Sequence, residues 1–235
     1  MSKDYFQFKQ FKVYHDKCAM KVGTDGLLLG TLTNSINSKN ILDIGSGTGL
    51  IALILAQRSP NALIDAVEIE SDAYEQARSN FVISVWSDRL KIFHTSIFDF
   101  RPKKKYDLIV SNPPYFINSL KSNGKKKEAA RHIDEQFFAK LAVKVNDLLE
   151  SDGKFWLILP LIESDQFAKE ALHVGLFPEI IFNVHSFDHA EAKRKIVAFG
   201  KNCKTVAENK FVIYDSPGKH SAQYRSTVKD FLTIF

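Results

Sequence analysis

Asp43-Ile44-Gly45-Ser46-Gly47-Thr48-Gly49 is the most informative stretch of this 235-residue chain. The apolar run Asn40–Ile44 predicts a buried strand that enters this turn, and residues 50–57 predict a helix that leaves it. Glycines in a strand-to-helix turn let a ligand approach the backbone closely, and the first turn of the helix offers free N–H groups to an anionic group. We therefore expect a ligand site at this turn.

The spacing of the glycines distinguishes this turn from a dinucleotide-binding turn. A dinucleotide fold needs glycine at the first, third and sixth positions, so that the backbone can approach a pyrophosphate. Counting from Gly45, the third residue is Gly47, but the sixth is Leu50 and the additional glycine, Gly49, is the fifth. This departure counts against a pyrophosphate ligand.

Strands and helices alternate along the chain on both sides of the turn. Such alternation predicts an α/β fold, with a doubly wound, mostly parallel sheet that carries helices on both faces. Asp134 is a candidate cap for the helix over 135–149, and Asp152-Gly153 is a candidate turn after that helix. We expect seven strands, at 40–44, 62–69, 90–93, 106–111, 154–159, 180–184 and 195–199, with further helices at 72–85 and 165–173.

The chain shows no internal repeat, low-complexity tract or linker that would divide it. We therefore expect one catalytic domain over residues 39–203, preceded by a short leader over 1–38 that packs near the ligand site. Residues 204–235 form a C-terminal extension, in which Phe211 begins a strand-like run and the end is helix-like. The pattern of this extension indicates no function.

The composition indicates a globular protein with a buried core, because 45% of the residues are hydrophobic. No apolar run reaches the roughly 18 residues of a membrane helix, and the first residues lack the apolar region of a signal peptide. We therefore expect a cytoplasmic protein without membrane contact, and we favour a monomer. Cys18 and Cys203 lie far apart with no Cys-x-x-Cys motif, so no metal site is expected.

Asn112-Pro113-Pro114-Tyr115 follows the strand predicted at 106–111, at the end of the strand where open α/β sheets bind ligands. Two consecutive prolines have fixed φ angles and no N–H groups, so they make a stiff loop with outward carbonyl groups. If the Asn112 side-chain oxygen and the Pro113 carbonyl each accept one N–H of an NH₂ group, they orient that nitrogen for attack. Tyr115 offers a ring on which an acceptor base can stack.

The glycine turn, preceded by Asp43, together with the Asn-Pro-Pro-Tyr run resembles the S-adenosylmethionine-dependent Rossmann-like methyltransferases. What this resemblance implies is that S-adenosylmethionine is the methyl donor and that Glu68, at the end of the second strand, accepts hydrogen bonds from the ribose hydroxyls. Many relatives carry Asp after the third strand to recognise adenine, whereas this chain has Ser96 there. The implied cofactor contacts are Asp43, Gly45, Gly47, Gly49, Glu68, Ser96 and Asn112.

Residues 15–30, His-Asp-Lys-Cys-Ala-Met-Lys-Val-Gly-Thr-Asp-Gly-Leu-Leu-Leu-Gly, resemble the segment before the glycine turn in bacterial tRNA1(Val) (adenine37-N6)-methyltransferases. Ala130-Arg131-His132 and Lys193-Arg194-Lys195-Ile196 extend the resemblance over most of residues 5–200. It implies methylation of N6 of adenosine 37 in a valine tRNA. It also places Thr24 in the cofactor wall, although Thr24-Asp25 equally fits a helix cap.

Basic residues concentrate around the Asn-Pro-Pro-Tyr loop. Residues 101–131 contain nine basic and two acidic residues, a local net charge of +7 in a chain whose total is +5. Such a segment attracts a polyanion through counterion release, although a solvated lysine loop has the same composition. The residues expected to contact the tRNA anticodon loop are Lys103, Lys104, Lys125, Lys126, Lys127 and Arg131.

Three other functions fit parts of the same pattern. A glutamine N5-methyltransferase of release factors uses the same four residues, but the roughly 40 residues before Ile41 are too few for the helical N-terminal domain of that family. A ribosomal-RNA guanine-N2 methyltransferase would also suit the basic loop. An RNA-binding module that has lost activity is the alternative outside catalysis.

Overall fold

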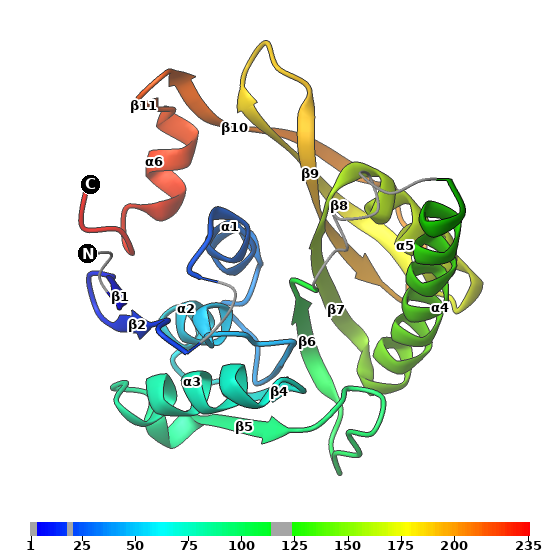
Figure 1. Cartoon of the computed structure of the whole chain (residues 1–235), viewed down its shortest axis with the longest axis horizontal. Helices are drawn as coiled ribbons and strands as arrows, with labels where there is room; N and C mark the ends of the chain where they lie inside the picture. Colours follow the sequence, from blue (N-terminus) through cyan, green and yellow to red (C-terminus); the bar gives the residue numbers. More distant parts are fainter. Residues whose placement is uncertain (1–3, 18–20, 114–123) are drawn as a thin grey trace.

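The computed structural model describes residues 4–17, 21–113 and 124–235, with side chains from residue 136 onward in the last range. In these residues a nine-stranded sheet forms the centre of the molecule (Figure 1), in the order β11-β10-β8-β9-β7-β6-β3-β4-β5. The strands are β3 (Asn40–Ile44), β4 (Leu63–Glu68), β5 (Leu90–His94), β6 (Tyr106–Ser111), β7 (Leu149–Leu159), β8 (Phe177–Phe187), β9 (Ala192–Gly200), β10 (Ala207–Ser216) and β11 (Lys219–His220).

Most neighbouring strands of this sheet are parallel. β5, β4, β3, β6 and β7 pair in parallel, whereas β9 is antiparallel to both of its neighbours, β7 and β8. β8 therefore runs in the same direction as β7, and β10 pairs in parallel with β8. Consequently β3, β4, β5, β6, β7, β8 and β10 all end at the same edge of the sheet, where β9 begins. We call this edge the carboxyl edge and the opposite one the amino edge.

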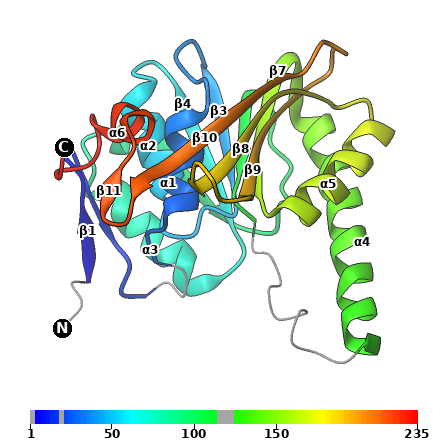
Figure 2. The same ribbon diagram turned by 90° about the horizontal axis from the view of Figure 1, so that it is seen from above.

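Helices cover both faces of the sheet, as expected for a doubly wound fold. Alternate residues of a strand face opposite sides, so Ile41 packs under α1 and α2 while Leu42 packs under α4 and α5. Figures 1 and 2 show α1, α2 and α6 on one face, and α4 and α5 on the other. The helices are α1 (Thr24–Leu32), α2 (Leu50–Arg58), α3 (Ser71–Val82), α4 (Gly124–Leu148), α5 (Leu161–His173) and α6 (Ala222–Val228).

The seven expected strands are all present, and β10 and β11 extend the sheet beyond them. Two local expectations were wrong. Asp134 does not cap a helix, because α4 already begins at Gly124, in a segment rich in the good helix formers Lys, Glu and Ala. Asp152-Gly153 does not separate helix from strand, because β7 is continuous from Leu149. It accommodates these residues as an irregularity between the partners of Tyr106 and Leu108.

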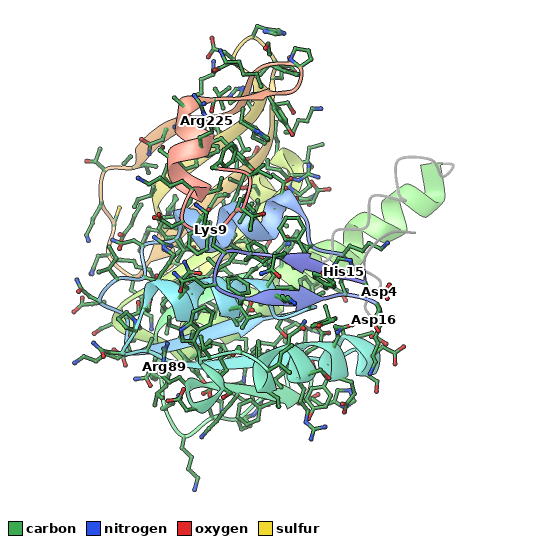
Figure 3. The ribbon with its side chains drawn as sticks, turned by 90° about the vertical axis from the view of Figure 1, so that its left-hand side faces the viewer. Asp4, Lys9, His15, Asp16, Arg89 and Arg225 are labelled. Atoms are coloured by element: carbon green, nitrogen blue, oxygen red, sulfur yellow. The ribbon has the colours of Figure 1, made fainter. Side chains whose placement is uncertain are left out.

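The leader forms a small antiparallel hairpin of β1 (Tyr5–Gln7) and β2 (Lys12–Tyr14) beside the main sheet. Its apolar side chains Phe8, Phe11 and Val13 are buried in the same cluster as α1 and α2. The Lys9 N–H donates to the Phe231 carbonyl at 2.7 Å, so the hairpin also contacts the C-terminal segment. Figure 3 shows His15 and Asp16 at the end of the hairpin on the side toward which α4 projects.

None of the described helices is both long enough and apolar enough to cross a membrane.

Candidate active site

Three segments of the expected site meet at the carboxyl edge of the sheet. Ile44 at the end of β3 pairs with Val67 of β4 on one side and with Ser111 of β6 on the other. The glycine turn, Glu68 and Asn112 follow these paired residues directly, so parallel pairing brings the three segments together.

The glycine turn holds a backbone conformation that other residues rarely adopt. Gly45, Gly47 and Gly49 have φ angles of 69°, 55° and 80°. A Cβ atom at Gly49 would lie 2.5 Å from Cε1 of Phe81, so α3 packs closely against the start of α2. A Cβ atom at Gly45 or Gly47 would meet no atom of the described structure within 4 Å, so these two glycines leave open space on their side of the turn.

Hydrogen bonds hold this turn to β4 and to the leader. The Gly45 N–H donates to the Val67 carbonyl at 2.9 Å. The buried Asn80 side chain of α3 donates through Nδ2 to the carbonyl groups of Thr48 and Tyr14, and its Oδ1 accepts from the Tyr14 N–H. Asn80 was not among the residues predicted from the sequence, where its only signal is a polar residue on the buried side of an amphipathic helix. Through the Asn80 amide, the leader hairpin helps to hold the glycine turn in place.

Asp43 lies beneath the glycine turn and is fully buried. Its Oδ2 accepts from the Ala52 N–H at 3.2 Å, whereas its Oδ1 finds no hydrogen-bond donor among the described residues. Burial raises the pKa of the Asp43 carboxyl from 3.8 to about 7; the negative charge of Glu68 also raises this pKa, while the Ala52 N–H lowers it. The turn therefore stands over a carboxyl group that titrates near neutrality.

This raised pKa predicts that Asp43 lowers the stability of the ligand-free protein as pH increases. The folded state holds the Asp43 proton more tightly than the unfolded state, so the contribution of Asp43 to stability is complete below about pH 4. It is lost as pH rises to about 7, by at most about 1.4 kcal/mol per pH unit. Urea unfolding of wild type and Asp43→Asn between pH 4 and 8 should show the asparagine variant gaining stability relative to wild type. A pH-independent difference would contradict the prediction.

Glu68 is buried, with 8% of its surface exposed, and backbone N–H groups fix its carboxylate. Oε2 accepts from Gly47 at 2.9 Å, and Oε1 accepts from Ile69 and Glu70 at 2.9 and 3.0 Å. A carboxylate has about four acceptor sites. Three of them are used here, so Glu68 holds the glycine turn in place and keeps about one site for a further donor.

Asn112 lies at the end of β6, beside the glycine turn. Its side-chain oxygen, Oδ1, is buried and finds no hydrogen-bond donor among the described residues. Just before it, the Ser111 hydroxyl donates to the Ile44 carbonyl at 3.0 Å and so ties the end of β6 to the start of the turn. Pro113 is also buried, whereas Pro114 and Tyr115 lie outside the described residues.

The loop after β5 carries Ser96, the expected adenine contact. The Thr95 N–H donates to the Glu68 carbonyl at 3.0 Å, so this loop starts beside the glycine turn. The Ser96 hydroxyl accepts from the Phe98 N–H at 3.2 Å, which fixes its position within the loop and leaves its O–H donor for a further partner. His94 pairs with Glu68 and stacks on Tyr74 with ring centroids 4.8 Å apart, which adds an aromatic surface that the sequence analysis missed.

Thr24 is the first residue of α1, and the interpretation of Thr24-Asp25 as the cap of this helix was wrong. Gly23 occupies the N-cap position, and no side chain caps the helix there. The Asp25 carboxylate instead accepts from Nε of Arg194 at 3.0 Å. Because Arg194 lies near the start of β9, at the carboxyl edge, this ion pair joins the leader to the far half of the sheet.

The expected nucleic-acid contacts separate into two groups. Lys103 and Lys104 precede β6 and therefore lie at the amino edge, about 20 Å from Asn112 at roughly 3.3 Å per strand residue. Lys104 forms an ion pair with Asp65 at 2.9 Å, and Asp65 also accepts from the Tyr106 hydroxyl. The structure therefore does not bring these two lysines to Asn112.

The second group lies on α4, which returns from the carboxyl edge to the amino edge. Its 25 residues span about 37 Å, whereas the six residues of β6 span about 20 Å, so the start of α4 projects beyond the carboxyl edge (Figure 2). Lys125, Lys126, Lys127 and Arg131 belong to this projecting part, and their side chains lie outside the described residues.

Comparisons with known proteins identify the family of this chain. Residues 16–161 match the family model of the methyltransferase small domain. The chain is 43% identical to a tRNA1(Val) (adenine(37)-N6)-methyltransferase of Pedobacter heparinus, over 99% of this chain and 100% of that protein. It is 44% identical to the protein of the same name from Phocaeicola vulgatus, over 98% of each chain.

A solved structure of similar fold is that of a predicted O-methyltransferase from Agrobacterium tumefaciens. It superposes with a TM-score of 0.67 at 18% identity and covers 88% of this chain and 96% of that chain. At this identity the likeness supports the fold alone. From the family model and the full-length relatives, the chain belongs to the methyltransferase small domain family, among the tRNA1(Val) (adenine37-N6)-methyltransferases.

Proposed function

We propose that this protein transfers a methyl group from S-adenosylmethionine to N6 of adenine 37 in the anticodon loop of tRNA1(Val), in the cytoplasm. The observation that carries this proposal is the 43–44% identity, over 98–99% of the chain, to relatives that bear this name. The site supports it, because a backbone turn for an adenosyl ligand and a buried amide acceptor lie side by side at the carboxyl edge.

The open side of the glycine turn suits the methyl donor. We assign the space left by Gly45 and Gly47 to the methionine part of S-adenosylmethionine, above Asp43. The remaining acceptor site of Glu68 takes a ribose hydroxyl, and the loop around Ser96 lies beside the adenine. Thr24 at the start of α1 belongs to the wall of this site. When bound, S-adenosylmethionine supplies an electrophilic methyl group on a sulfonium centre.

The Asn112 amide and the Pro113 carbonyl hold the acceptor. An exocyclic amine of adenine is a weak nucleophile, because its lone pair is delocalised into the ring. Two acceptors that each bind one N–H fix the orientation of the amine, so that the lone pair turns toward the methyl group. No strong base is required, because the N–H proton becomes acidic once the nitrogen carries the methyl group.

Adenine 37 has to leave its stack to reach Asn112. Extruding a stacked base costs a few kcal/mol, which a stacking surface in the site offsets in part. We assign this surface to Tyr115 and the phosphate contacts around the anticodon loop to Lys125, Lys126, Lys127 and Arg131 on the projecting part of α4.

The test is incubation of the purified protein with labelled S-adenosylmethionine and unmodified tRNA, followed by nucleoside mass spectrometry and mapping of the modified position. N6-methyladenosine at position 37 of tRNA1(Val) is the expected product. N2-methylguanosine in ribosomal RNA, or methylated glutamine in a release factor, with no tRNA product, would overturn the proposal in favour of a different acceptor.

Glu68→Ala is expected to weaken S-adenosylmethionine binding about 10- to 100-fold, because it removes a charged hydrogen-bond acceptor and releases the Gly47 N–H. Isothermal titration calorimetry measures this change. The matched control is Glu70→Ala, because the Glu70 carboxylate accepts from the Ala73 N–H and so caps α3, whereas the Glu68 carboxylate accepts from the Gly47 N–H of the turn. This control should lose about 1 kcal/mol of stability and keep its cofactor affinity. Equal affinities for the two variants would refute the ribose assignment.

A further inference from the structure

A groove lies between α4 and the loop after β5, outside the site described above. Its volume is about 530 Å³, and Phe98 and Val143 supply apolar surface. Lys140 and Lys144, one helical turn apart on α4, line it together with Asp147. The groove abuts the loop that carries Ser96, so it begins close to the candidate active site and continues along α4.

Cations from three separate segments gather around this groove. Arg101 lies close enough to Lys144 for its charge to lower the Lys144 pKa, in addition to the larger effect of burial. Burial, and then the charge of Lys105, lower the pKa of Lys201 in the same way. We call Arg101, Lys105, Lys140, Lys144 and Lys201 the α4 basic face.

Few carboxylates balance these charges. Asp147 and Asp99 are the carboxylates whose charges act on Lys144, and Asp147 also acts on Lys201, so the five cations named above outnumber these two carboxylates by three. Lys144 donates to the Phe100 carbonyl, and Lys201 donates to the carbonyl groups of Asn146 and Leu149. These backbone contacts fix the ammonium groups in place without neutralising them.

The position of the α4 basic face relates it to the candidate active site. Lys140 and Lys144 lie 16 and 20 residues after Gly124, or about 24 to 30 Å along the helix axis from its projecting start. One helix therefore carries basic residues from beyond the carboxyl edge, where the acceptor would bind, back to Lys105 and Lys201 near the amino edge. A partner that extends over this length and carries regularly spaced negative charge matches this surface.

We propose that the α4 basic face and its groove bind the sugar-phosphate backbone of the tRNA several nucleotides away from the base that is methylated. This inference rests on the proposed function for the identity of the RNA. The lysines position the substrate by contacting phosphates, which fixes the orientation of the RNA without reading its sequence. They take no part in the methyl transfer itself.

The test uses two exposed lysines that have no structural hydrogen bond, in the double variant Lys105→Glu/Lys140→Glu. The matched control is Lys91→Glu/Lys229→Glu, which changes the net charge equally at exposed positions on β5 and after α6. Affinity for tRNA1(Val) is measured by fluorescence anisotropy over a range of salt concentrations. The Kd for S-adenosylmethionine is measured alongside to show that both variants are folded.

The double variant is expected to bind tRNA at least about tenfold more weakly than the control. The slope of log K against log salt concentration should become shallower by about 1.4 to 1.8, because each of the two phosphate contacts contributes about 0.7 to 0.9. In turnover assays the KM for tRNA should rise while kcat at saturating tRNA stays unchanged.

Equal affinities and equal salt slopes for the double variant and its control would overturn the proposal, and would leave the groove as a site for some other partner. Because binding is measured apart from turnover, this outcome differs from a failure of the proposed function. An absence of methyl transfer to tRNA by the wild-type protein contradicts the proposed function. An unchanged salt slope in the double variant contradicts the proposal that the α4 basic face binds the tRNA backbone.

Discussion

Asn112→Ala is expected to lower kcat about 100-fold or more while changing the Kd for S-adenosylmethionine less than about threefold. The Asn112 oxygen is buried without a hydrogen-bond donor among the described residues, at the end of β6 beside the glycine turn. Its removal takes away an acceptor that orients the adenine amine, but leaves the glycine turn, Asp43 and Glu68 unchanged. Single-turnover kinetics and calorimetry separate the two effects.

The matched control for Asn112→Ala is Ser111→Ala, one residue earlier on the same strand. The Ser111 hydroxyl donates to the Ile44 carbonyl and is given no role in holding the adenine amine, so its replacement should cost about 1 kcal/mol of stability and leave the chemical step nearly unchanged. A cofactor affinity that collapses in parallel with kcat in Asn112→Ala would show that Asn112 supports the turn instead of holding the acceptor.

Gly49→Ala is expected to lower the free energy of unfolding by about 3 kcal/mol. A Cβ atom at this position would lie 2.5 Å from the Phe81 ring, and the φ angle of 80° is unfavourable for alanine. Overpacking contributes about 1 to 3 kcal/mol and the left-handed conformation about 1 to 2 kcal/mol. Urea unfolding measures this loss of stability. The expected consequence is a smaller amount of folded enzyme, with little change in the rate of the chemical step for the molecules that are folded.

Gly47→Ala separates backbone strain from ligand space. Its φ angle of 55° carries a similar conformational cost, but its Cβ would meet no atom within 4 Å, so the loss of stability should be only about 1 to 2 kcal/mol. The added methyl group enters the space assigned to S-adenosylmethionine, so the Kd for the cofactor should rise at least about tenfold. Unchanged cofactor affinity in Gly47→Ala would place the ligand elsewhere.

Several elements of the central sheet were predictable because their signals are local. β3 and β6 occur over the expected residues, 40–44 and 106–111. Strands buried on both faces read as continuous apolar runs, which their flanking turns delimit. The strand that became β10 was harder to read, because its first four residues, 207–210, are all exposed and three of them are polar. Only its pairing with β8 makes these residues part of the sheet.

The members of the candidate site were predictable for a related reason. Asp43 and Glu68 lie within the last two residues of recognisable strands and Asn112 follows another. The ends of parallel strands meet at one edge whatever the order of the strands. The supports of the site were not predictable in this way. Asn80 reaches Tyr14 across 66 residues of sequence, and Arg194 reaches Asp25 across 169. No local pattern marks such partners.

The sequence by itself determined the α/β class, the glycine turn and the set of residues at the carboxyl edge, because each depends on short-range periodicity or turn chemistry. Only the tertiary structure decided which charges share a surface. Lys104, close to the Asn-Pro-Pro-Tyr loop in sequence, lies at the opposite edge and pairs with Asp65, while Lys105 approaches Lys201. The raised pKa of Asp43 likewise arises from burial, which is set by helices packed over the strand. Burial and charge proximity are long-range consequences of packing, and they lie beyond what sequence spacing records.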